Sequence, residues 1–74
     1  MLELMRTNDP VVLGLARSVL EEAGVLAMVA DNHMSVLEGS IGVFPQRLLV
    51  HRDEMAAARS LLEEAGLAAW LLAP

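Results

Sequence analysis

Apolar residues recur at helical spacing in two stretches of the chain, and a glycine follows each stretch. The first stripe consists of Val12, Leu13, Ala16, Val19, Leu20 and Ala23. The second consists of Met55, Ala58, Leu61, Leu62 and Ala65. Apolar residues that return every three or four positions line one face of an amphipathic helix. Gly24 and Gly66 suit the left-handed conformation that ends many helices. The pattern therefore predicts two helices, each buried along one side.

The residues before each stripe favour the start of a helix. Asn8 or Asp9 can cap the first helix, because a short side-chain oxygen accepts hydrogen bonds from the free backbone N–H groups of the first turn. Pro10 follows at the first helical position, where the N–H that proline lacks would have no partner in the helix. Asp53 is the predicted cap of the second helix.

Four shorter apolar segments flank the helices and predict strands at 2–7, 25–30, roughly 47–52 and 67–72. Alternation assigns the side chains of the first and third strands to two faces of a sheet. The set predicted to face the helices is Leu2, Leu4, Leu48 and Val50. The set predicted on the opposite face is Glu3, Met5, Thr7, Arg47, Leu49 and His51. An ion pair between Glu3 and Arg47 across the two strands is then expected.

Two segments of the chain are nearly identical. ARSVLEEAGV at 16–25 and ARSLLEEAGL at 58–67 differ at two positions, both of them aliphatic exchanges. We interpret the chain as a single domain, 1–74, with an internal repeat of one strand–helix unit at 1–30 and 43–73. Two such units side by side predict an α+β fold, the ferredoxin-like βαββαβ plait, with a four-stranded antiparallel sheet and two helices on one face.

Size and composition favour self-association. A chain of 74 residues has a small core, and with no cysteine it has no disulfide to stabilise it. Hydrophobic residues make up 55% of the chain, and the predicted strands at 25–30 and 67–72 are apolar on both faces. Because two helices cover one face of the sheet only, we expect a homo-oligomer that forms through the open face or an edge of the sheet.

Charge and hydropathy limit the possible partners. The net charge is −5, with five arginines and no lysine, which disfavours binding to nucleic acid or to an anionic membrane. The first ten residues lack the basic and apolar regions of a secretion signal, and no apolar run is long enough to cross a bilayer. The expected location is cytoplasmic.

The segment 31–42, DNHMSVLEGSIG, is longer than a hairpin connection needs. Its polar and flexible residues are Asp31, Asn32, His33, Ser35, Glu38, Gly39 and Gly42. Long loops of compact domains often carry function. An ordinary surface loop, with its aliphatic residues packed against the sheet, is an equal alternative.

A metal site is the alternative chemistry. Asp31, His33 and Glu38 could act as ligands, and His51 could add another, but their spacing matches no diagnostic metal motif. Gly39-Ser40-Ile41-Gly42 is not a nucleophile elbow, and the glycine-rich phosphate-binding motifs are absent from the sequence. The sequence thus indicates no catalytic residue and no cofactor.

Three stretches, ELMRTNDPV, the EEAG helix ends and HMSVLEGSIGVFPQRLLV, resemble a small bacterial domain family of unknown function. That family is labelled "putative prokaryotic signal transducing protein", and the resemblance extends to near Leu67. It implies a fold similar to that of the PII nitrogen-regulatory proteins, which are ferredoxin-like and assemble through their sheets. In those proteins the connection between the second and third strands contacts partners, and its position matches 31–42 here. The ATP-binding motif of the PII proteins does not carry over.

The sequence therefore favours a non-enzymatic regulatory or signal-transducing module that acts through 31–42 and the open sheet face. The candidate binding residues are Arg6, Asp31, Asn32, His33, Glu38, Gly39, Arg47 and His51. A small metal-dependent protein or enzyme that uses Asp31, His33 and His51 is the competing hypothesis. A protein partner is expected at 31–42.

Overall fold

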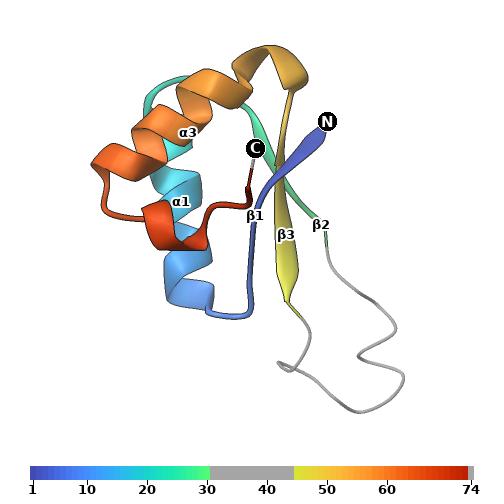
Figure 1. The fold of residues 1–74 in the computed structure, drawn as a ribbon, viewed down its shortest axis with the longest axis vertical. Coiled ribbons are helices and arrows are strands. Elements are labelled where there is room, and N and C mark those ends of the chain that lie inside the picture. Colours follow the sequence, from blue (N-terminus) through green and yellow to red (C-terminus); the bar gives the residue numbers. More distant parts are fainter. Residues whose placement is uncertain (31–44, 74) are drawn as a thin grey trace.

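The computed structural model describes residues 1–30 and 45–73 of the chain. In chain order these form β1 (Leu2–Thr7), α1 (Pro10–Glu22), β2 (Ala27–Ala30), β3 (Gln46–Val50), the short 3-10 helix η1 (Arg52–Glu54), α3 (Met55–Glu64) and the 3-10 helix η2 (Ala68–Trp70). Figure 1 shows α1 and α3 packed next to each other beside the strands. None of the helices in the described part of the chain is both long and apolar enough to cross a bilayer.

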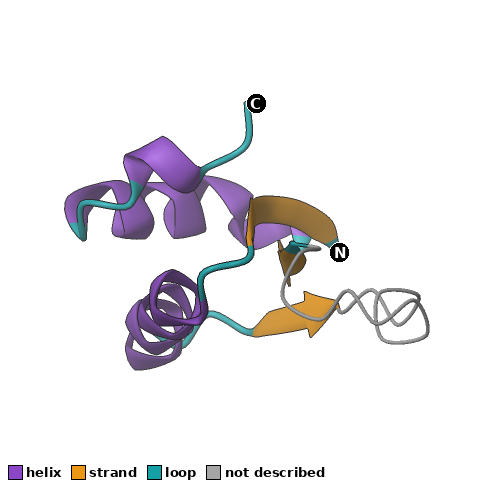
Figure 2. Ribbon diagram, turned by 90° about the horizontal axis from the view of Figure 1, so that it is seen from below, coloured by secondary structure: helices purple, strands orange, loops and turns teal. Residues whose placement is uncertain are grey.

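The three strands form one antiparallel sheet in the order β1-β3-β2, so β3 is the central strand. Both helices lie on the same side of this sheet (Figure 2). The mixed α+β class and the two helices over one face of an antiparallel sheet agree with the sequence analysis. The strand bounds differ by one or two residues, since β2 begins at Ala27 and β3 ends at Val50.

The core lies between the covered face of the sheet and the inner sides of the helices. Its residues are Leu4, Met5, Val12, Leu13, Ala16, Leu20, Val25, Leu48, Val50, Ala58, Leu62 and Leu67. The centres of both predicted helical stripes are thus confirmed. Ala23 and Ala65, which end the stripes, are exposed because each is the C-cap residue, where the chain turns out of the helix.

A β-bulge in β1 corrects the predicted faces of this strand. Glu3 pairs with Leu49 and Met5 pairs with Leu48, so Leu4 is an extra residue in β1. An extra residue interrupts the alternation of the strand, so the side chains after it change face. Met5 and Thr7, predicted on the open face, are therefore buried at 0% and 7% relative exposure.

The first helix starts and ends as its sequence predicts. Asp9 Oδ1 accepts hydrogen bonds from the backbone N–H groups of Val11, at 2.9 Å, and Val12, at 3.4 Å. At the other end Gly24 has a φ of 79°. The N–H of Val25 donates to the carbonyl of Leu20, which closes a Schellman motif.

The second helix repeats the end of the first but not its start. Gly66 has a φ of 84°, and the N–H of Leu67 donates to the carbonyl of Leu62 in the same motif. The predicted cap at Asp53 is wrong, because this residue lies inside η1 and α3 begins after it. His51 caps η1 instead, with its Nδ1 accepting the N–H of Asp53 at 3.2 Å.

The predicted fourth strand at 67–72 is wrong for its first half. Residues 68–70 form η2, in keeping with two consecutive alanines, which are depleted in strands. The chain then makes one isolated antiparallel bridge between Leu71 and Met5, and the N–H of Leu72 donates to the carbonyl of Leu4 at 3.1 Å. Within the described residues, the C-terminal segment thus touches the outer edge of β1 without forming a strand.

Candidate functional site

The face of the sheet opposite the helices carries a mixed set of polar and apolar side chains. Leu48 and Val50 of β3 are fully buried against the helices. Because side chains alternate along a strand, Arg47 and Leu49 point to the other side of the sheet. Their partners in the sheet extend this side onto the neighbouring strands. We define the open face as Glu3, Arg6, Met28, Arg47 and Leu49.

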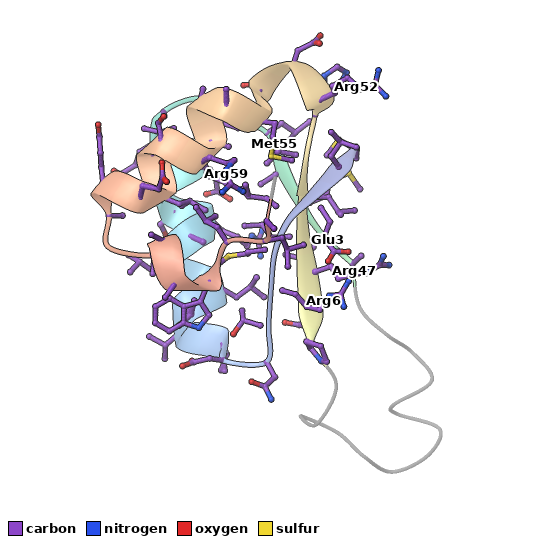
Figure 3. All side chains as sticks on the ribbon, in the orientation of Figure 1. Glu3, Arg6, Arg47, Arg52, Met55 and Arg59 are labelled. Carbon is purple, nitrogen blue, oxygen red and sulfur yellow. The ribbon has the colours of Figure 1, made fainter. Side chains whose placement is uncertain are left out.

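Glu3, Arg6 and Arg47 form an ion-pair cluster on the open face, and Figure 3 shows the three side chains together beside β1 and β3. Arg6 donates from Nε, at 2.9 Å, and from Nη2, at 2.6 Å, to Glu3 Oε2. Arg47 Nη1 lies 3.7 Å from Glu3 Oε1. The predicted pair between Glu3 and Arg47 is thereby confirmed.

The bulge in β1 places Arg6 in this cluster. Strict alternation from Leu4 would turn Arg6 towards the helices, where a guanidinium would lose its hydration. With Leu4 as the extra residue, Arg6 and Glu3 share the open face, and Arg6 lies directly opposite Arg47 in the register. Two like charges at opposed positions repel, and the carboxylate of Glu3 between them reduces this repulsion.

The two arginines are not equivalent. Arg6 makes two hydrogen bonds to Glu3, whereas the 3.7 Å separation at Arg47 exceeds hydrogen-bond length. The side chains of Arg6 and Arg47 are 51% and 49% exposed, and that of Glu3 is 19% exposed. Within residues 1–30 and 45–73, Arg47 therefore presents its donors to solvent on the open face.

Charge is unevenly distributed over the described residues. The open face holds Arg6 and Arg47 with Glu3, a net charge of +1. The other described charges are Arg17, Arg52 and Arg59 against Asp9, Glu21, Glu22, Asp53, Glu54, Glu63 and Glu64, a net charge of −4. The open face is thus a small positive area on an acidic molecule.

Apolar side chains continue the open face beyond the cluster. Met28 of β2 pairs with Leu49 of β3, and the side of the sheet that they share is not covered by α1 or α3. Met28 is 52% exposed, and Leu49 is half-buried. Leu26, just before β2, is 68% exposed. Contiguous exposed apolar patches that are rimmed by polar residues mark protein-binding surfaces.

The structure separates His51 from the arginines with which it was grouped. Arg47 is near the start of β3 and His51 follows its last residue, four positions later, so they are about 13 Å apart along the strand. Because His51 caps η1 at the far end, it does not belong to the cluster. Asp31, Asn32, His33, Glu38 and Gly39 lie outside the described residues.

The competing metal hypothesis gains no support from the described residues. No group of three or more His, Asp or Glu side chains with the geometry of a metal site occurs among them. His51 Nδ1 faces Asp53, with 3.6 Å between Nδ1 and Oδ2. The two other proposed ligands, Asp31 and His33, lie outside the described part.

Sequence reasoning missed Met28 as a member of the site. The segment around it is apolar on both faces, so alternation gave no reason to single it out. The pairing of β2 with β3 provides that reason, since Met28 lies beside Leu49 and on its side of the sheet. The available signal was the alternation of β3, because a residue of β2 that pairs with Leu49 lies on the same side of the sheet as Leu49.

One family matches most of this chain. The family described as "Putative prokaryotic signal transducing protein" matches residues 1–66, which include the three strands, both helices and every residue of the open face. The C-terminal residues from Leu67, with η2 and the bridge to Met5, follow the matched region. No curated protein matches the chain.

Proposed function

The chain belongs to the family described as "Putative prokaryotic signal transducing protein", and from this premise we propose that it is a non-enzymatic binding module whose binding surface is the open face. One observation carries this proposal. A side of the sheet that the helices leave uncovered joins half-exposed Met28 to the Glu3–Arg6–Arg47 cluster. A surface of this kind is suited to a protein partner.

The segment 31–42 is part of the same proposal. The chain leaves β2 at Ala30 and returns to β3 at Gln46, and Ala30 pairs with Arg47 in the sheet. The two ends of the connection therefore adjoin the arginine end of the open face. The expectation that 31–42 contacts a partner stays a prediction, because its residues lie outside the described part.

We further propose that the chain is a ferredoxin-like plait whose fourth strand is reduced. The strand order β1-β3-β2 is that of three strands of the plait, and Leu71 bridges Met5 where the fourth strand would pair. The common Schellman ends of α1 and α3 support the interpretation of the chain as an internal repeat.

Self-association through an edge of the sheet is compatible with this use of the open face. β2 is an outer strand, and among the described residues no strand pairs with its far edge. Unpaired backbone groups on an edge can pair with a second copy. Light scattering over a range of protein concentrations tests this, and a monomer mass at every concentration contradicts it.

Affinity capture from native lysate tests the binding module directly. The full chain is immobilised as wild type, as Arg47→Gln, as Met28→Asp and as Arg17→Gln. Arg17 is a matched control, since its side chain is 50% exposed and its ion pair to Glu21 measures 3.8 Å, much as Arg47 pairs with Glu3. We expect wild type and Arg17→Gln to capture proteins that Arg47→Gln and Met28→Asp do not capture. Equal retention by all four proteins would refute the proposed binding surface.

A further inference from the structure

Within residues 1–30 and 45–73, the charge of Arg47 is only partly neutralised, by Glu3. Arg47 lies directly opposite Arg6 in the sheet, and two like charges at opposed positions repel each other. The carboxylate of Glu3 lies near both arginines, but it accepts its hydrogen bonds from Arg6. The nearest oxygen of Glu3 is 3.7 Å from Arg47, too far for a hydrogen bond. A second carboxylate placed at Arg47 would relieve the repulsion and accept hydrogen bonds from guanidinium N–H groups that make none to the described part of the chain.

We propose that the open face binds an acidic segment of a protein partner. A carboxylate of that segment pairs with Arg47, and an aliphatic side chain packs on Met28 and Leu49. This inference rests on the proposed function, since it names the chemistry of the partner at the same surface. Glu3 is a positioning residue here, because it holds Arg6 in place through two hydrogen bonds and does not itself contact the carboxylate.

The spacing of the side chains sets a condition on the partner. Arg47 and Leu49 are two residues apart on β3 and point to the same side, which separates them by about 7 Å. Met28 is the sheet partner of Leu49 and widens the apolar end. An acid and an aliphatic residue spaced i, i+2 in an extended segment, or about one turn apart on a helix, match this separation.

Charge favours this partner over the other occupants. The open face is +1, whereas the other described charges sum to −4, so a polyanion such as nucleic acid would be repelled by most of the molecule. A second copy that met the first face to face would bring two positive areas together. A short acidic and aliphatic segment contacts the positive area alone.

Binding of synthetic peptides to the full-length protein tests the proposal. Three peptides have the same length and the same leucine content. Their variable positions are all Glu in the first peptide, all Gln in the second and all Lys in the third. The amide resonances of the ¹⁵N-labelled protein report where each peptide binds. We expect the Glu peptide to shift the amides of Met28, Arg47 and Leu49, and to bind about tenfold more weakly to Arg47→Gln, as the loss of one charge-assisted hydrogen bond requires. Arg17→Gln should bind as wild type does.

Several results overturn the inference. Equal binding of the Gln or Lys peptide removes the role of the carboxylate. Equal shifts with acetate alone at the same carboxylate concentration show a small-anion site without an apolar contact. Shifts of the open face with protein concentration, in the absence of peptide, show that a second copy occupies it.

The capture experiment separates this inference from the proposed function. If Met28→Asp and Arg47→Gln fail to capture proteins that wild type captures, and the Glu peptide does not bind, the open face is a binding surface. The proposal that its partner is acidic is then wrong. If capture is the same for all variants, both proposals fall. Salt provides a further check, because an interaction with exposed Arg47 should weaken as ionic strength rises.

Discussion

Leu4 and Met5 are adjacent in β1, yet both side chains are completely buried. Neighbours in a regular strand point to opposite faces, so this burial is possible only because Leu4 is the extra residue of a bulge. The bulge has two consequences. It brings Met5 into the core and buries Thr7, and it returns Arg6 to the side of the sheet where Glu3 lies.

Because of the bulge, we expect truncation of two methionines in the same sheet to have very different effects on the free energy of unfolding. Met5→Ala removes a fully buried side chain, and we expect it to lower the free energy of unfolding by about 2–5 kcal/mol. Met28→Ala truncates the same side chain at a site that is 52% exposed, and we expect a change within about 0.5 kcal/mol. Urea unfolding followed by circular dichroism measures both. Similar values for the two variants would place Met5 on the open face and refute the bulge.

Helix capping gives a second pair of matched variants. Asp9 accepts hydrogen bonds from two backbone N–H groups at the start of α1, and Asp9→Ala should cost about 1 kcal/mol of stability. Asp53 lies in η1 and is 82% exposed, so Asp53→Ala should cost less than about 0.5 kcal/mol. The same unfolding measurement compares them. A larger effect at Asp53 would restore it as the cap of α3.

Both helices were predictable because their signals are local. The apolar stripes and the glycines that follow them need no information from the rest of the chain, and Gly24 and Gly66 take the expected positive φ. The false cap at Asp53 shows the limit of such signals. A 3-10 turn capped by His51 begins at Arg52, one residue before Asp53, and this turn depends on where β3 ends.

The sheet was less predictable because its faces depend on pairing between distant segments. Alternation in β3 and at the start of β1 was sufficient to predict the pair between Glu3 and Arg47. It failed after Glu3 in β1, since the position of a bulge is set by the register against β3. Two alanines of the predicted fourth strand favoured η2, and pairing with β1 is reduced to the bridge at Leu71. Arg6 was one of the candidate binding residues, and the bulge explains its place in the cluster.

Gly14 and Gly24, inside and at the end of α1, predict stability changes of opposite sign. Gly24 has a φ of 79°, which an L-residue adopts at a cost, so Gly24→Ala should destabilise the protein by about 1–2 kcal/mol. Gly14 lies inside α1, and an added Cβ would meet no atom within 4 Å. Gly14→Ala should therefore stabilise the protein by about 0.5–1 kcal/mol. Thermal unfolding distinguishes the two signs, and a loss of stability in Gly14→Ala would contradict the open space beside it.

Arg59 connects α3 to the C-terminal segment, and the last prediction concerns this contact. Arg17 occupies the matching position of the first repeated segment and pairs with Glu21, whereas Arg59 Nη1 donates to the carbonyl of Leu72 at 2.6 Å. The N–H of Leu72 in turn donates to Leu4 in β1. The side chain of Arg59 therefore helps to hold the segment against the edge of the sheet.

Replacing Arg59 should loosen this segment without unfolding the domain. In Arg59→Gln the amide of Leu72 should exchange with deuterium about tenfold faster, because its bond to Leu4 opens more often once the charged contact is lost. Amides at the centre of β3, such as that of Leu48, should keep their protection, since the core around them is unchanged. Arg17→Gln is the control and should leave the exchange of Leu72 as it is. Unchanged exchange of Leu72 in Arg59→Gln would mean that the bridge between Leu71 and Met5 holds the segment without the arginine.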